Sequence, residues 1–388
     1  MFSKRLKSTL RMITLSVIVF ALVACTAPAA PVAENASDNA AAEVQVEAKV
    51  LRIQSVLPAT ADEVFMLNDF AADVTALTGG SLEFEILPAG SVVGVDETLD
   101  AVDKGLIDGG FAWTHYWSGK HPAAMLFGSP VAGAGVGIDN IAFLSWFQYG
   151  GGKELYDQLW VEMDMNVKGF MLQPVGPEAL GWFSEPIESM DDFRQYRFRA
   201  PPGIPGQTYT DIGVAAVAMG GGDILPALES GTIDAAEWCC PKPDSVFGFQ
   251  KVLKHYYLQG LHQVVVNADM YLNGDVWESL TPREQKAIEV AANASLSKAM
   301  SYRIIENGKA LKDLVDNEGV ILHDTPADYF PAYMNAARAS LETNAEENEF
   351  FAEVWQSQKD FAEIAVPFWA GAQTSNAQLG KAFADSLE

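Results

Sequence analysis

The segment LDAVDKGLID at residues 99–108 recurs as LPALESGTID at residues 225–234. Both fit the pattern L-x-A-(V/L)-x-x-G-x-I-D, which is typical of a helix that ends at a glycine and is followed by a strand. Such joints occur in any α/β protein, so the repeat could be incidental; we favour one such unit in each of two similar lobes. A ligand cleft between the lobes would then lie beyond the two strands, at residues 113–116 and 237–244.

The chain around the first segment alternates strands with helices. Apolar periodicity predicts strands and helices in the order strand 50–56, helix 62–77, strand 82–87, helix 96–104 and strand 109–113. This alternation predicts an α/β fold.

The second half of the chain is richer in helices. Thr281-Pro282 predicts the start of a long helix that ends near residue 315, because proline is favoured in a first helical turn. Other expected elements are a helix leading into a strand at 244–257, a strand at 264–272, and helices at 326–341 and 346–365. The last helix carries an aromatic stripe that is typical of a core but could instead dock on another subunit: Phe350, Phe351, Val354, Trp355 and Phe361.

The acidic composition limits the partners of the chain. There are 25 Lys and Arg against 51 Asp and Glu, a formal net charge of −26 at pH 7. Such a surface repels nucleic acid, so we expect no nucleic-acid partner. An anion site on this protein has to be locally positive.

The N-terminus indicates export. A basic start and a short apolar run predict a signal peptide over residues 1–24. Leu22-Val23-Ala24-Cys25 resembles a bacterial lipobox, which predicts lipidation of Cys25; an ordinary signal peptide with an incidental cysteine is the alternative. Residues 25–48 then form a flexible tether, and the folded body works outside the cytoplasmic membrane on a lipid anchor.

Signatures of common enzymes are absent from the sequence. It contains no G-x-S-x-G, Walker or H-E-x-x-H motif, so we predict that the protein is not an enzyme. The pairs His115/His121 and His255/His262 lack the spacing of a helical zinc site, and we interpret these histidines as surface or core residues. The adjacent Cys239 and Cys240 either form a strained vicinal disulfide or remain thiols, with no catalytic role in either case.

Three charged residues lie beside glycine, proline or aromatic residues rather than in charged surface runs: Glu178, Arg199 and Glu237. A guanidinium can hold a carboxylate through two parallel hydrogen bonds. Two carboxylates with little basic compensation attract a hard cation. The three residues together predict a site for a small organic acid and a metal ion.

The chain contains the motifs FAWTHYWSGK (111–120), GWF (181–183), RFR (197–199), IDAAEW (233–238) and GFQKV (248–252). These motifs resemble the solute receptors of TRAP transporters, in particular the branch that binds 2-oxo acids and lactate, and the resemblance spans about residues 50–365. It implies a two-lobed, periplasmic-binding-protein-like α/β fold with a long helix across both lobes and C-terminal helices. It also implies a membrane permease as partner.

The resemblance assigns roles to the candidate residues. It implies that Arg199 pairs with the substrate carboxylate and that Tyr116 lies near the substrate. It further implies a metal ion held by Glu178, Glu237 and the backbone carbonyl of Trp238, whose residue also borders the substrate. A swapped C-terminal helix in some members would give Phe351 and Trp355 of the aromatic stripe a partner in a homodimer.

The first departure from the family concerns the metal. Position 178 is commonly glutamine in this branch, whereas here it is Glu178. Glu178, Glu237 and a substrate carboxylate total −3 against +1 from Arg199, so a divalent ion balances the site and a monovalent ion does not. We therefore predict Ca²⁺ in preference to Na⁺.

The second departure lies in CCPKPD at residues 239–244. Lys242 could supply a second cation for a larger or dicarboxylic acid, or it could be a solvated lysine at the rim. Lys242 and Asp244 are thus further candidate substrate-binding residues. Two other functions stay open: a metal-dependent enzyme that uses Glu178 or Glu237 as a base, and a sensor subunit that binds the same acid.

These features together predict five regions. They are a signal peptide at 1–24; a tether at 25–48; lobe I at 49–176 and 265–304; lobe II at 177–264 and 305–345; and a C-terminal helical segment at 346–388.

Overall fold

The computed structural model describes residues 48–386, and these form two β-sheets with helices around them. The predicted signal peptide and Cys25 lie outside the described residues. Sheet A has the order β2 (Leu82–Leu87), β1 (Lys49–Ser55), β3 (Gly109–Trp113), β10 (Asn267–Asn273) and β4 (Val167–Pro174). Sheet B has the order β11 (Ile321–His323), β9 (His255–Tyr257), β5 (Gly181–Phe183), β8 (Ala235–Ala236), β6 (Arg197–Ala200) and β7 (Ala215–Ala218).

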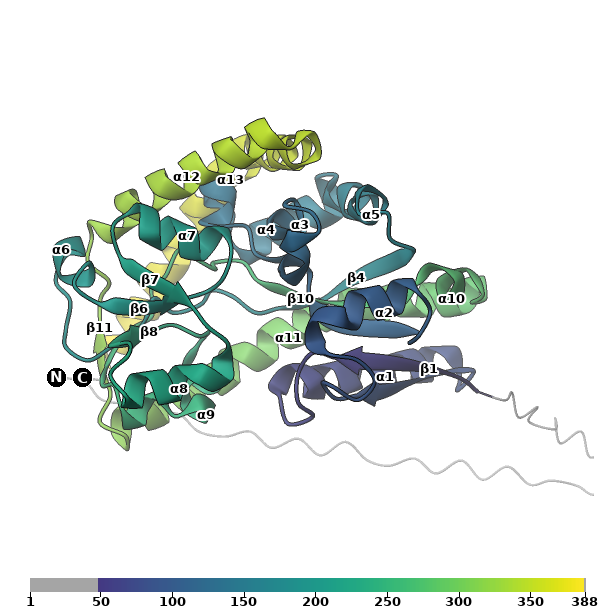
Figure 1. The fold of residues 1–388 in the computed structure, drawn as a ribbon, viewed down its shortest axis with the longest axis horizontal. Coiled ribbons are helices and arrows are strands. Elements are labelled where there is room, and N and C mark those ends of the chain that lie inside the picture. The colour runs from purple at the N-terminus through teal and green to yellow at the C-terminus, as the bar shows by residue number, and fades with distance from the viewer. Residues whose placement is uncertain (1–47, 387–388) are drawn as a thin grey trace, which may run out of the picture. The chain divides into compact units, whose positions relative to one another are not determined.

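Most helices are short and connect these strands (Figure 1). They are α1 (Asp62–Thr78), η1 (Val95–Glu97), α2 (Thr98–Asp103), η2 (Thr114–Gly119), α3 (Ala124–Gly128), η3 (Gly133–Gly137), α4 (Asn140–Tyr149), α5 (Gly152–Glu162), α6 (Met190–Phe193), α7 (Ile204–Asp211), α8 (Gly221–Glu229), α9 (Pro241–Phe247), η4 (Phe249–Lys251) and α10 (Gly274–Glu278). Among the described residues, no helix is both long enough and apolar enough to cross a membrane. The predicted α/β class is confirmed.

The repeated segment makes the same joint in each sheet. After α2 and after α8 the chain turns at Gly105 and Gly231, whose φ angles are 67° and 66°. In both joints the residue after the glycine donates its backbone N–H over 2.9 Å to the carbonyl of an alanine in the helix, Ala101 or Ala227. The first joint leads into β3 of sheet A and the second into β8 of sheet B. The prediction of one such unit in each lobe is confirmed, while the exact lobe boundaries stay a prediction.

The predicted long helix is α11 (Pro282–Asp316), and it packs against elements beside both sheets (Figure 1). It begins at Thr281, which exchanges side-chain and backbone hydrogen bonds with Glu284 in a capping box. The helix contacts β4 and α1 beside sheet A and α9 beside sheet B. Its buried Arg303 forms an ion pair of 2.6 Å with Glu63 of α1.

The C-terminal helices are α12 (Tyr329–Glu347) and α13 (Glu349–Ala384). Helix α13 extends well beyond the predicted end at residue 365. Phe351 and Trp355 are buried within this chain, and the Trp355 indole donates to the carbonyl of Ala134 over 2.9 Å. Phe351 and Trp355 therefore pack in a core, as is typical of such a stripe, and a partner subunit for them stays a prediction.

Candidate functional site

Strand pairing in sheet B brings three segments to one edge. Strand β5 runs antiparallel to both β8 and β9, so the residues before β5 lie beside the residues that follow β8 and β9. Glu178 precedes β5, Glu237 directly follows β8, and His262 follows β9. The predicted pair of glutamates is therefore brought together, and a histidine joins them.

Two glycines permit this close approach. Gly181 has a φ of 131°, and a Cβ there would lie 2.5 Å from the carbonyl oxygen of Ala236. A Cβ on Gly260 would lie 2.9 Å from the backbone nitrogen of Leu180. Side chains at either position would push apart the loops that carry the glutamates and the histidine.

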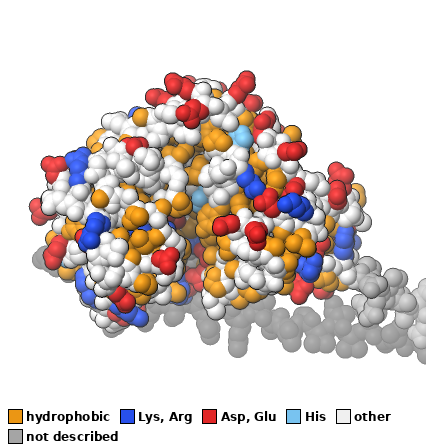
Figure 2. Space-filling model, viewed as in Figure 1, with side chains coloured by type: hydrophobic (Ala, Val, Ile, Leu, Met, Phe, Trp, Pro, Cys, Tyr) orange, Lys and Arg blue, Asp and Glu red, His pale blue; other side chains and the backbone are white. Residues whose placement is uncertain are grey.

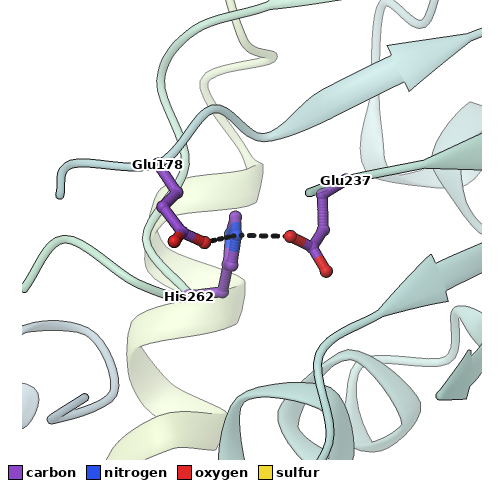
Figure 3. Close-up of side chains that lie close together, drawn as sticks. All are labelled: Glu178, Glu237 and His262. Carbon is purple, nitrogen blue, oxygen red and sulfur yellow. Dashed lines mark ion pairs between the residues drawn. The ribbon is translucent and has the colours of Figure 1, made fainter. Parts of the chain in front are cut away.

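The three side chains face one another in a buried cluster (Figure 3). The Nε2 of His262 lies 3.6 Å from Oε2 of Glu178 and 3.5 Å from Oε2 of Glu237. One ligand atom from each residue lies within 4.8 Å of the others. Within the described chain, these three atoms are buried and have no hydrogen-bond partner.

The charges of the cluster are strongly coupled. Burial raises the pKa of Glu178 to about 7. Burial also disfavours charge on Glu237, but Arg199 and His262 together outweigh it and hold the pKa of Glu237 below its usual value. Burial opposes the charged form of His262 as well, yet the two carboxylates raise its pKa to about 9. A protonated His262 thus supplies the positive charge between the carboxylates at neutral pH.

The donor set also fits a metal ion. Unpartnered buried carboxylate oxygens are the ligands that hard cations such as Ca²⁺ prefer, whereas an imidazole nitrogen suits transition metals. The Nδ1 of His262 lies 2.9 Å from the hydroxyl of Tyr209, a contact that orients the ring in either protonation state. A cation here would replace the charge of the His262 proton.

Arg199 lies in β6, where it pairs with Ala236 of β8, the residue before Glu237. Its Nη1 donates to the side chain and, over 3.1 Å, to the backbone carbonyl of Glu237, while Nε and Nη2 donate to the carbonyl of Met219. The guanidinium lies 5.2 Å from the centre of the Trp238 ring. These contacts use four of its five N–H bonds, so one N–H remains for a ligand.

A cavity of about 380 Å³ opens beside this cluster. Four of the predicted substrate-binding residues line it: Tyr116, Glu178, Arg199 and Trp238. Both predicted cleft segments contribute, since the ends of β3 and β8 meet there. The surface in Figure 2 is hollowed between two halves, with hydrophobic side chains on both sides of the hollow.

The two other predicted substrate-binding residues lie elsewhere. Asp244 is fully buried outside the described lining, and it accepts hydrogen bonds from Trp182, Tyr256 and the backbone N–H of Cys239 at 2.9–3.0 Å. This arrangement favours a role in holding the cavity wall. Lys242 is half-buried and does not line the cavity either. Its backbone N–H donates to the side-chain oxygen of Asn307.

The sequence does not predict that His262 belongs to the site, and it leaves open whether Cys239 and Cys240 form a disulfide. The spacing of the histidines favours a surface or core residue at His262, and no local pattern connects it to Glu178 or Glu237. Its position depends on the pairing of β9 with β5, which only the fold defines. Cys239 and Cys240 are both buried and are free thiols in the structure.

Comparison with known proteins places these features in context. Residues 54–348 match the family described as bacterial extracellular solute-binding protein, family 7. A monocarboxylate 2-oxoacid-binding periplasmic protein of Nostoc sp. is 29% identical over 292 residues, which cover 75% of this chain and 78% of that protein.

Solved structures share the fold. A TRAP transporter solute-binding protein from Bordetella bronchiseptica, whose structure holds calcium and picolinate, has a TM-score of 0.79 and 26% identity over 88% of this chain and 99% of its own. A TRAP periplasmic solute-binding protein from Colwellia psychrerythraea, with bound calcium and pyruvate, has a TM-score of 0.77 and 24% identity over 86% of this chain and 100% of its own.

Proposed function

The chain belongs to family 7 of the bacterial extracellular solute-binding proteins, and from this premise we propose that it is the receptor of a TRAP-type transporter for a small 2-oxo or 2-hydroxy acid. The acid binds together with a metal ion and is delivered to a membrane permease. The 2-oxoacid-binding relative from Nostoc and the calcium- and picolinate-containing receptor from Bordetella support this proposal. Membership of a solute-binding family also agrees with the prediction that the protein is not an enzyme.

One observation carries the proposal: a guanidinium with a free N–H and Glu178, whose buried Oε2 has no partner, line the same cavity, and the guanidinium pairs with Glu237, which carries a second unpartnered oxygen. Arg199 would bind a carboxylate oxygen of the acid. Glu178, Glu237 and the backbone carbonyl of Trp238 would hold the metal, and a neutral His262 would border it. Tyr116 and the Trp238 ring would flank the bound acid.

The charge balance of this cluster favours Ca²⁺. With a neutral His262, the two glutamates and the substrate carboxylate contribute −3 and Arg199 contributes +1, so a divalent ion brings the sum to zero. Na⁺ would leave about one uncompensated negative charge in a buried site, where the effective dielectric is low.

Thermal unfolding of the purified protein tests this function. Pyruvate, 4-methyl-2-oxopentanoate, lactate and 2-oxoglutarate are each added with Ca²⁺, with Na⁺ or with a chelator. We expect stabilisation that requires both an acid and Ca²⁺, since a ligand that binds the native state raises its melting temperature. No shift with any acid and any metal would refute the proposal.

The sensor alternative predicts the same binding but a different destination for the acid. Uptake of the labelled acid by cells would distinguish the two: loss of uptake on deletion of the gene supports transport, whereas unchanged uptake supports sensing.

We also propose that the protein is tethered by a lipid on Cys25, which lies outside the described residues. Metabolic labelling with a fatty acid tests the tether, because Cys25→Ala should abolish incorporation.

We also propose a homodimer through the C-terminal part of α13, at the exposed residues Ile364 and Phe368 rather than at Phe351 and Trp355. Ile364 and Phe368 are 83% and 76% exposed, whereas the N-terminal aromatic residues of the helix are buried. Sedimentation of Phe368→Glu tests this contact, because a buried charge at the interface should give monomers. An unchanged mass would refute this contact.

A further inference from the structure

The cavity offers a positive partner to one carboxylate. Among the described residues that line it, Arg199 is the only lysine or arginine. His115 also lines the cavity, but burial lowers its pKa to about 4, so it is neutral near pH 7. Lys242, which could have supplied a second cation, lies outside that lining.

The wall formed by α1 is acidic. Asp62 and Glu63 line the cavity there. Glu63 is neutralised by its 2.6 Å ion pair with Arg303, and Asp62 accepts a hydrogen bond from the hydroxyl of Tyr302 over 3.2 Å. A second carboxylate on the ligand would find no cation and would face the Asp62 carboxylate.

The remaining wall is apolar and aromatic. One pair of rings comes from the end of β3 and from η2, where Trp113 and Tyr116 have centroids 5.3 Å apart. A second pair comes from the sheet B side, where Trp238 and Phe247 have centroids 4.7 Å apart. All four rings line the cavity. Apolar ligand surface placed between these pairs would be removed from water.

The cavity is larger than a three-carbon acid requires. Its volume of about 380 Å³ corresponds to roughly thirteen water volumes of about 30 Å³ each. Pyruvate and a metal ion fill roughly half of that space, which leaves room for a tail of roughly four to six carbon atoms.

We propose that the natural ligand is a 2-oxo monocarboxylate with a branched aliphatic or aromatic tail, and that the protein discriminates against pyruvate and against dicarboxylates. The carboxylate and 2-oxo group lie at Arg199 and the cation cluster, and the tail lies between the two aromatic pairs. This inference rests on the proposed function, because it assumes that the acid head binds at Arg199.

Calorimetric titration at fixed Ca²⁺ compares pyruvate, 4-methyl-2-oxopentanoate, phenylpyruvate and 2-oxoglutarate. Each methylene buried strengthens binding about fourfold. We therefore expect 4-methyl-2-oxopentanoate to bind at least about thirtyfold more tightly than pyruvate. We expect 2-oxoglutarate to bind more weakly than 4-methyl-2-oxopentanoate and phenylpyruvate. Equal affinity for pyruvate, or tighter binding of 2-oxoglutarate, would overturn the inference while leaving the receptor function intact. The receptor function itself would fail if none of the acids bound.

A gain-of-function variant tests the position of the tail. Val246 lines the cavity from α9 and is 73% exposed, so Val246→Lys adds a cation at the tail end without disturbing the core. We expect this variant to bind 2-oxoglutarate at least about tenfold more tightly than the parent.

Val161→Lys is the matched control, since Val161 is 75% exposed on α5 and lies outside the described lining. It should leave every affinity unchanged. If Val246→Lys gained nothing for 2-oxoglutarate, or if Val161→Lys gained as much, the tail would not lie where we place it.

Discussion

Replacing Arg199 with alanine removes both the contacts that this side chain makes within the protein and the contact that it makes with the bound acid. In the structure its guanidinium pairs with the buried carboxylate of Glu237 and donates to the carbonyl of Met219. Removing one partner of a buried ion pair costs about 3–5 kcal/mol of stability. Losing the charged contact to the acid costs about 2–5 kcal/mol of binding free energy, which is about thirtyfold to several thousandfold in affinity.

The substitution should therefore lower both the stability of the protein and its affinity for the acid. Urea unfolding of the metal-free protein measures the first effect, and titration of 4-methyl-2-oxopentanoate with Ca²⁺ measures the second. Arg197→Ala is a matched control on the same strand, because Arg197 pairs with Asp234 at 2.9 Å but is 54% exposed. This exposed pair should contribute about 1 kcal/mol or less, with no effect on the acid.

Arg199→Lys separates the two roles. It keeps a positive charge beside Glu237, but its three N–H bonds are too few to replace the four that Arg199 donates to Glu237 and Met219 and still donate one to the acid. We expect it to be more stable than Arg199→Ala and still to bind the acid poorly. If folded Arg199→Ala protein bound the acid within about threefold of the parent, Arg199 could not be the carboxylate partner.

Three further predictions concern the buried acids and the metal. Glu178→Gln removes one negative charge from the cluster, so the preference for Ca²⁺ over Na⁺ should fall by at least about tenfold in competition titrations; an unchanged preference would exclude Glu178 as a ligand. Chelation of the metal should weaken acid binding strongly while leaving a folded protein, because the protonated His262 replaces the cation; full acid affinity in chelator would contradict a bridging metal. Burial raises the pKa of Asp269 from 3.8 to about 7. Between about pH 4 and pH 7 the folded protein therefore keeps a proton on Asp269 that the unfolded chain has lost. The free energy of unfolding should fall as pH rises through that range. Asp269→Asn should reduce that fall, measured by urea unfolding at pH 5 and pH 7.5, and an identical fall would show that Asp269 does not cause it.

The sequence predicted much of the site because its chemistry is local to strand ends. Arg199 lies in a short strand and each glutamate precedes or follows one, and glycine, proline and aromatic neighbours distinguish the three from solvated charges. The repeated segment likewise predicts a joint that depends on ten consecutive residues and one glycine. Such local features can be inferred without knowing the tertiary structure.

Features that depend on distant contacts could not be inferred in the same way. His262 joins the cluster only because β9 pairs with β5, far from it in sequence. The predicted end of the last helix, residue 365, lies just before Pro367, and proline lacks the N–H that a helix uses. The helix continues because Trp369 packs against the core and donates to Asp139 over 2.7 Å, a tertiary contact that outweighs the local preference.

The strand order of sheet A also constrains the order in which the chain can be assembled. Strand β10 lies between β3 and β4, yet it is made only after the chain has passed through most of sheet B. A chain that stopped anywhere between residues 174 and 267 would leave β3 and β4 with open edges, and such edges pair readily with other chains. Sheet A is therefore a late product of synthesis, and the nascent protein needs protection from aggregation until residue 273 has emerged.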